Sequence, residues 1–278
     1  MRILLALLTC SSLFLFSCQK EVDFANTGNS GNGGNNGTVL TKVVSKSGTD
    51  SSVLQFGFNS SGKLGTLDFI DQSGGTSSVT NERVERDGQG IIQRLIIKDD
   101  QYQQQGIDSV ITVVAYSGGR YLSKVTTIDL GILLFKDSVA LIYDGNGNVV
   151  TERTFDDAGT GTYDESGKTD YTYSGNNISS ILYYSYDSGT ASYTLGETFT
   201  YDEFDNKPSP MTVGDEAFVF DSPELFSANN PTKSSVSASG TTQSYTTTYT
   251  YNSSNRPLTA TSVIQPGNQT ITGTYYYQ

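Results

Sequence analysis

Histidine and tryptophan are absent from this chain of 278 residues, and cysteine occurs only twice. Without histidine the chain has no Ser-His-Asp or Cys-His nucleophile, no His-ligated zinc and no imidazole general base. The two cysteines, Cys10 and Cys18, both lie near the N-terminus, so we expect no disulfide to hold the rest of the chain together. An enzyme of this composition would have to use carboxylates, tyrosine or lysine.

Basic residues are also scarce. The chain has 17 lysine and arginine residues against 29 aspartate and glutamate residues, a net charge of −12 at pH 7. This acidic balance opposes nucleic-acid binding, because phosphates would be repelled. The glycine pair Gly118-Gly119 lacks the following helix and Lys-Ser/Thr pair of a phosphate-binding loop. We therefore expect no nucleic-acid partner and no cofactor.

Long hydrophobic runs are missing except at the N-terminus. Ile3 to Phe16 follows Arg2 and is too short to span a bilayer, which is typical of a signal peptide over residues 1–17. Cys18 directly after a small residue matches a bacterial lipobox, which predicts that Cys18 is acylated and becomes the mature N-terminus. Each buried CH₂ of the acyl chains contributes about 0.8 kcal/mol, so the anchor is stable. The alternative is an ordinary secretory signal with an unmodified cysteine.

Asparagine and glycine dominate the segment that follows. Asn26 to Gly37 has no hydrophobic side chain to bury and should behave as a flexible linker with a mean span of roughly 20 Å. We interpret residues 18–37 as a lipidated tether that carries a body at residues 38–278. We expect this body to be a single all-β repeat domain.

A short pattern occurs seven times in the body. Two aromatic or β-branched residues at i and i+2 precede a polar turn, and an aliphatic residue follows. In the seven copies, the residue at i+2, directly before the turn, is Phe58, Arg86, Tyr116, Tyr143, Tyr173, Tyr201 and Tyr251. The first six are spaced by 28, 30, 27, 30 and 28 residues. Such a period indicates one supersecondary unit used repeatedly.

Each repeat has the features of a β-hairpin. Asn, Asp and Gly in the turns tolerate the positive φ that hairpins need, and runs such as 245–251 alternate with period two. Seven hairpins predict roughly fourteen strands in an antiparallel meander. Because open sheets rarely exceed about ten strands, we expect a strongly curved sheet or a barrel-like shell.

The spacing breaks once, between Tyr201 and Tyr251, which are 50 residues apart. The extra residues, near 207–230, include Ser222-Pro223-Glu224, which signals the start of a short helix. The segment either covers one end of the shell or folds into its interior. Its large apolar residues are expected to pack rather than to bind a ligand: Phe218, Phe220, Leu225 and Phe226.

Tyrosine is the residue type that best supports a binding site, since 18 are present. Neighbouring hairpin positions cluster Tyr183, Tyr184, Tyr186 and Tyr193, which could form a stacking platform for sugars. The alternative is a cross-strand ladder that keeps the sheet in register. Asp156-Asp157 and similar acidic pairs are interpreted as solvated turn carboxylates.

Two features resemble metal or membrane sites and are interpreted otherwise. Asp144 to Asn148 begins like a calcium loop, but Val149 stands where the loop needs glycine, so we expect a hairpin turn and no metal site. Charged residues within or beside the strand segments oppose insertion of the strands into a bilayer. They are Glu82, Arg86, Arg94 and Lys98.

Two resemblances extend this interpretation. The segment from Tyr143 to Val149 resembles the YD repeats of Rhs-type proteins, which build a spiralling β shell. The lipobox, the tether, the repeats, the 205–210 break and the segment 229–231 together resemble Bacteroidetes lipoproteins of unknown function with a porin-like fold. This resemblance implies a β shell and an outer-membrane lipoprotein, and it supplies no catalytic residues.

The sequence therefore predicts a lipid-anchored protein of the cell envelope, held to the outer membrane and facing the cell surface or the periplasm. Its predicted role is a non-catalytic binding or scaffold module for a glycan or another envelope protein. Two alternatives are a carboxylate-dependent glycan hydrolase and a purely structural β shell.

Overall fold

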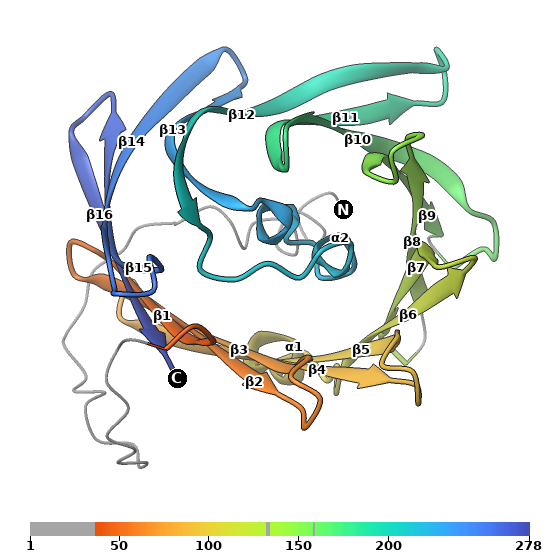
Figure 1. Cartoon of the computed structure of the whole chain (residues 1–278). Coiled ribbons are helices and arrows are strands. Elements are labelled where there is room, and N and C mark those ends of the chain that lie inside the picture. The colour runs from red at the N-terminus through yellow and green to blue at the C-terminus, as the bar shows by residue number, and fades with distance from the viewer. Residues whose placement is uncertain (1–36, 132–133, 158) are drawn as a thin grey trace.

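A computed structural model describes residues 37–131, 134–157 and 159–278, and shows a closed antiparallel barrel of sixteen strands (Figure 1). The strands are β1 (Leu40–Ser47), β2 (Asp50–Phe58), β3 (Leu64–Ser73), β4 (Thr76–Arg86), β5 (Ile92–Asp99), β6 (Val110–Ser117), β7 (Arg120–Asp129), β8 (Leu134–Tyr143), β9 (Val149–Asp157), β10 (Asp164–Ser174), β11 (Asn177–Asp187), β12 (Ser192–Pro208), β13 (Asn229–Ala238), β14 (Thr241–Tyr251), β15 (Pro257–Gln265) and β16 (Gln269–Tyr277). The helical elements are α1 (Asp100–Gln104), α2 (Glu216–Val219) and the 3₁₀ turn η4 (Pro223–Phe226). The all-β class is thereby confirmed.

The two strands beyond the predicted fourteen close the barrel. Six of the seven sequence repeats are turns, joining β2 to β3, β4 to β5, β6 to β7, β8 to β9, β10 to β11 and β14 to β15. The turn predicted after Tyr201 was wrong, because residues 202–206 continue β12. Strands β1 and β16 lie outside the first and last repeat. They pair with each other, with Leu40 opposite Tyr277 and Val43 opposite Tyr275. Because every strand has two neighbours, the sheet has no free edge.

Four of the six repeat turns share the same hydrogen bonds. The side-chain oxygen of the first turn residue accepts from the backbone N–H groups two and four residues later, at Asn59, Asp87, Asp144 and Asn252. Asn and Asp favour such turns because the side chain replaces a backbone acceptor. Asp144 to Asn148 is thus a hairpin turn, as predicted.

Alternation along the strands places apolar residues inside the barrel. Leu54, Phe56 and Phe58 of β2, and Tyr171 and Tyr173 of β10, belong to or pack against the central core. The residues between them point outward, since successive side chains in a strand alternate between the two faces. The core therefore lies within the barrel.

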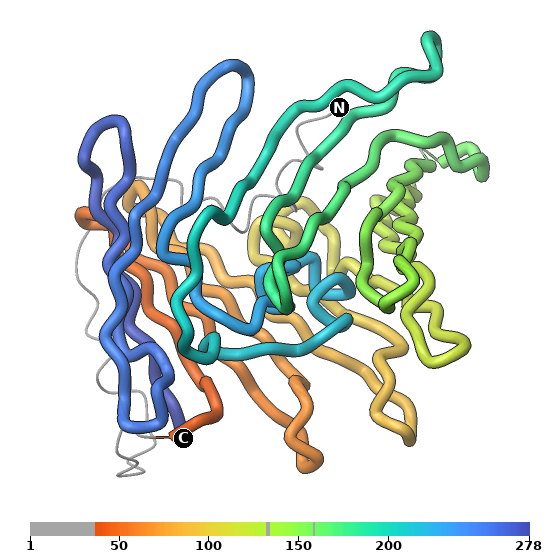
Figure 2. The backbone as a smooth tube through the Cα atoms, turned by 45° about the horizontal axis from the view of Figure 1, so that its top comes forward, coloured from red at the N-terminus to blue at the C-terminus, as the bar shows by residue number. Residues whose placement is uncertain are grey.

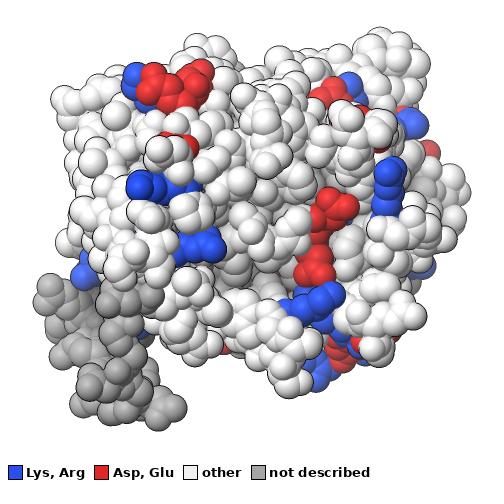
Figure 3. Space-filling model, viewed as in Figure 1, with Lys and Arg blue, Asp and Glu red and all other residues white. Residues whose placement is uncertain are grey.

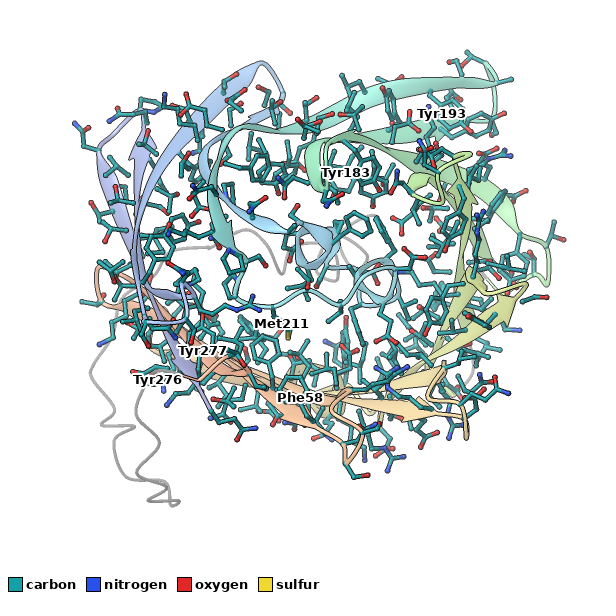
Figure 4. All side chains as sticks on the ribbon, in the orientation of Figure 1. Phe58, Tyr183, Tyr193, Met211, Tyr276 and Tyr277 are labelled. Carbon is teal, nitrogen blue, oxygen red and sulfur yellow. The ribbon has the colours of Figure 1, made fainter. Side chains whose placement is uncertain are left out.

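The insertion between β12 and β13 folds into the interior, which decides between the two predicted alternatives (Figure 1; Figure 2). Met211 lies inside the ring of strands (Figure 4), and Phe218 is completely buried. The apolar residues of α2 and η4 pack with the inward side chains of the wall, which confirms their predicted packing role. We call residues 209–228 the plug.

Asp205 and Asn230 hold the two strands together where the plug leaves and re-enters the wall. The carboxylate of Asp205 accepts from the backbone N–H of Asn230 at 3.2 Å and from its side-chain amide at 3.0 and 3.1 Å. Tyr251 donates its hydroxyl to the same carboxylate. These bonds keep β12 beside β13 although the plug interrupts their turn.

The outer wall carries charged side chains among exposed hydrophobic ones. Ion pairs lie between outward positions on neighbouring strands or within one strand: Glu85–Arg94, Arg153–Glu165, Lys168–Asp170 and Glu203–Lys233. Figure 3 views the barrel from the end seen in Figure 1, where the charged side chains form several small groups separated by uncharged surface. A lipid-facing wall would place such charges in hydrocarbon at a cost of about 2–4 kcal/mol for a lysine or arginine at the midplane.

Candidate functional site

Three of the four predicted tyrosines meet on the outer wall, where β10, β11 and β12 lie side by side. The ring of Tyr193 lies 5.0 Å from that of Tyr186 and 6.4 Å from that of Tyr184, between centroids. The Lys168 ammonium lies 4.5 Å from the Tyr184 centroid and 5.1 Å from the Tyr193 centroid. We call Lys168, Tyr184, Tyr186 and Tyr193 the outer patch.

Hydrogen-bonded charges fix one edge of the outer patch. Arg153 binds the carboxylate of Glu165 through two nitrogens, at 2.8 and 2.5 Å, and Tyr193 donates its hydroxyl to the same carboxylate. The bond from Arg153 lowers the pKa of Glu165, while the bond to Glu165 raises the pKa of Tyr193. The patch thus combines rings with carboxylate and ammonium groups whose positions are fixed.

Tyr183 does not belong to the outer patch. It points inward and packs edge-on against Phe199, with 5.7 Å between ring centroids. Figure 4 labels Tyr183 and Tyr193 on the same hairpin, but their side chains lie on opposite faces of the wall. For Tyr183 the structure agrees with the ladder interpretation.

A second group of polar residues lies on the inner wall. Glu152 accepts a 2.7 Å hydrogen bond from Tyr171 through one oxygen, and its other oxygen is buried with no hydrogen-bond partner among the residues that the structure describes. Burial, followed by repulsion from Asp221, raises the pKa of Glu152 to about 7, although Lys124 acts in the opposite direction. Burial and the Asp221 carboxylate also raise the pKa of Glu82 to about 7.

Asp137 and Asp156 face each other across β8 and β9 on the same inner wall. Burial raises the pKa of Asp137 to about 7, with repulsion from Asp156 as the next cause. Burial also raises the pKa of Asp156. The prediction of a solvated turn was therefore wrong for Asp156, which faces the lumen, while Asp157 accepts from the turn N–H groups of residues 159–161.

Lys124 links this inner wall to the plug. Its ammonium donates to the carbonyl of Phe218 at 2.6 Å and to the carboxylate of Asp221. Burial alone would lower the pKa of Lys124, but the carboxylates of Asp221 and Glu152 outweigh it, and the pKa is raised. Lys124 therefore keeps its charge inside the barrel.

Arg86 fastens the plug on a neighbouring part of the wall. Its guanidinium binds both oxygens of Glu216 at 2.7 and 2.8 Å, and it also donates to the carbonyls of Leu64 and Gly90. Tyr121 adds a 3.3 Å hydrogen bond to Glu216. Glu82 and Arg86 thus face the lumen. In the sequence analysis they were named, together with Arg94 and Lys98, as charges that oppose insertion of the strands into a bilayer.

These inner residues were missed as a group in the sequence analysis because the strand positions were not each assigned to a face of the sheet. They occupy inward strand positions that otherwise hold apolar side chains. A single sequence shows that side chains alternate between the two faces of a strand, but it does not show which face points into the barrel. The available signal was their phase: Glu82 is two residues from Val84, and Lys124 is three from Tyr121 across a β-bulge.

Membrane helices and metal sites are not found in the described part of the chain. No helix among these residues has the length and apolar character needed to cross a membrane. Nor do the described residues gather three or more acidic, cysteine or histidine side chains in an arrangement that could hold a metal ion.

Comparison with known proteins identifies the fold. No protein-family model matches the sequence, and no curated protein matches it. Crystal structures of porin-like proteins from Bacteroides uniformis and Bacteroides vulgatus match with TM-scores of 0.54 and 0.51, each at 13% identity. The matches cover 87% of this chain and 98% and 99% of those chains. The porin-like fold implied by the sequence resemblance is confirmed.

Proposed function

We propose that this chain is a non-catalytic binding module of the bacterial cell envelope that recognises a glycan on the outer patch. The observation that carries this proposal is the ring cluster around Lys168, in which the exposed Tyr193 lies against the half-buried Tyr184 and Tyr186. The porin-like fold of the two Bacteroides proteins supports an envelope setting. The Cys18 anchor, which lies outside the described residues, would hold the barrel at the outer membrane.

Each part of the patch has a role in such recognition. Tyrosine supplies a flat apolar face with a hydroxyl at its edge, which suits a sugar ring with apolar C–H faces and polar substituents. Glu165 and Lys168 lie beside the rings and can exchange hydrogen bonds with hydroxyl groups. The patch lies on the long β11–β12 hairpin, which projects at one end of the barrel (Figure 2). A bound polysaccharide would therefore meet little steric hindrance.

Replacing Tyr193 with alanine tests the proposal on a glycan array. Tyr193 touches both other rings and Lys168, so Tyr193→Ala should weaken binding about tenfold or more, which corresponds to about 1.4 kcal/mol. The matched control is Tyr276→Ala. Tyr276 is 38% exposed on the opposite wall and has Lys42 4.2 Å from its ring, so it should have no effect on binding.

Three outcomes would contradict the proposal. The first is a wild-type protein that binds no glycan, and the second is an equal loss in Tyr193→Ala and Tyr276→Ala. The third is release of shortened glycan products, which would indicate the hydrolase alternative. Thermal unfolding of each variant separates lost binding from lost folding.

The lipid anchor makes a separate prediction. Cys18→Ser should abolish incorporation of labelled palmitate and move the protein from the membrane fraction to the aqueous fraction, because acylation requires the thiol. Cys10→Ser should change neither, since Cys10 lies within the expected signal peptide. Membrane retention of Cys18→Ser would contradict the anchor.

A further inference from the structure

A depression lies on the inner wall formed by β14, β15, β16 and β1. In one row across these strands Tyr249 is opposite Ala260, Ala260 is opposite Gly273, and Gly273 is opposite Ser45. In the next row Ser262 stands between Thr247 and Ile271. Small side chains thus occupy inward positions that elsewhere hold bulky core residues.

These small side chains form the floor of the depression. Tyrosine rings surround this floor and leave a cavity of about 170 Å³. Its lining consists of Ser45, Tyr245, Thr247, Tyr249, Ala260, Ser262, Ile271, Gly273 and Tyr275. Six of these nine residues carry a hydroxyl group, and none carries a charge. The lining is therefore neutral and aromatic with several hydroxyl groups, and most of the surface open to the cavity is apolar.

The backbone does not require the small side chains. A Cβ atom at Gly273 would lie 3.7 Å from the Ala260 Cβ and from a Tyr275 ring carbon, which is ordinary contact. Alanine would also lower the entropy of the unfolded chain and so stabilise the protein. The depression therefore results from the small side chains at these positions, because the strand backbone at Gly273 would accept a larger residue.

Several hydroxyl groups at the cavity keep hydrogen-bonding capacity. Thr247 and Ser262 bond each other at 2.8 Å, and Tyr249 donates to the carbonyl of Pro231 at 3.0 Å. Among the described residues, the hydroxyls of Ser45 and Tyr275 have no hydrogen-bond partner. Uncharged donors and acceptors around aromatic rings match a neutral polyhydroxylated ligand.

We infer that this cavity binds a single neutral hexopyranose ring, at a site separate from the outer patch. A cavity of roughly 150 Å³ is large enough for one benzene-sized ring, so this depression can seat one pyranose ring whose substituents extend through its open side. The tyrosine rings contact the C–H faces of the sugar. The serine, threonine and tyrosine hydroxyls bind its hydroxyl groups.

Titration of the full-length mature protein in detergent with a panel of methyl hexopyranosides tests this inference by calorimetry. We expect saturable binding of at least one sugar at one site per chain. Ala260→Leu fills the floor and should weaken this binding about tenfold or more. Because Ala260→Leu could disturb packing, Thr247→Val provides a second variant that removes a hydroxyl at similar volume and should weaken binding several-fold.

The two proposed sites are distinguished by crossed controls. Tyr193→Ala should bind the methyl hexopyranoside as the wild type does, and Ala260→Leu should keep any polysaccharide binding on the outer patch. The inference is overturned if no monosaccharide in the panel binds. It is also overturned if folded Ala260→Leu and Thr247→Val both bind as tightly as the wild type, or if Tyr193→Ala removes the monosaccharide binding.

Discussion

Replacement of Phe218 with alanine should destabilise the protein by about 3–5 kcal/mol, the usual range for removing a buried phenylalanine. Phe218 is completely buried at the centre of the plug. Its ring lies 5.1 Å from Tyr171 of the wall and 5.8 Å from Phe226 of the plug, between centroids. The variant therefore loses contacts on both sides and leaves a cavity between plug and barrel.

The effect should concentrate on the plug, because Lys124 also binds it through the carbonyl of Phe218. A shift of this residue disturbs the ammonium and its bond to Asp221. Limited proteolysis should then cut within residues 209–228 faster than in the wild type, while the β-sheet signal in circular dichroism persists at low temperature.

Phe155→Ala is the matched control. Phe155 lies on the outer wall beneath the guanidinium of Arg153, 5.4 Å from the ring centroid, and is only partly buried. Its removal should cost less than about 1 kcal/mol, as for most exposed substitutions. Equal losses for the two variants in chemical unfolding would show that the plug does not contribute to the core.

The repeats made the wall of the barrel predictable. Each turn carries its own signal in Asn, Asp and Gly, so six of the seven copies mark hairpin turns independently of the rest of the chain, while the copy at 202–206 lies within β12. Closure by β1 and β16 was not predictable in the same way, because it is a contact between Leu40 and Tyr277, far apart in the sequence. The expected number of strands predicted a strongly curved sheet or a barrel-like shell, but it did not distinguish between these two forms.

The plug was predictable as an insertion but not in its location. The 50-residue gap and the Ser-Pro-Glu signal identified a short helical segment, and η4 begins at Pro223 as that signal requires. Whether it enters the barrel depends on tertiary contacts such as that between Arg86 and Glu216, which are 130 residues apart. Helix α1 was missed since its return loop has no apolar stripe.

The predicted tyrosine platform did not take into account that adjacent side chains in a strand point to opposite faces. Tyr183 and Tyr184 are adjacent, so the pleat alone places them on opposite faces. The position of Tyr193 opposite Tyr186 was harder to foresee. It depends on the hairpin register and on the β-bulge at Tyr183/Tyr184, which lets Gly196 be skipped in the pairing.

The inner carboxylates lead to the second large effect. Raising the pH from 5 to 8 should lower the midpoint of thermal unfolding by on the order of 5–10 °C. Glu82, Asp137 and Glu152 each have a folded-state pKa of about 7, mainly because they are buried. Burial of a carboxylate favours its neutral form.

The direction follows from proton binding. In the unfolded chain these groups lose their protons near pH 4, whereas in the folded barrel they hold them until about pH 7. The stability linked to these protons is complete below the unfolded pKa and is lost as the pH rises through the folded pKa. The chain has no histidine, so no ordinary side chain titrates in this window.

Glu152→Gln isolates the most deeply buried of the three groups. Glutamine keeps an oxygen that can accept the Tyr171 hydroxyl, and it cannot ionise, so the slope of stability against pH between 5 and 8 should become smaller. Glu165→Gln is the control. The hydrogen bond from Arg153 lowers the pKa of Glu165 and outweighs the opposite effect of burial, so that variant should lose stability equally at pH 5 and pH 8. A wild-type midpoint that stays constant or rises across this window would show that the inner carboxylates remain ionised. In that case Lys124 and water would have to neutralise the lumen, and the Glu152→Gln variant would have the same slope as the wild type.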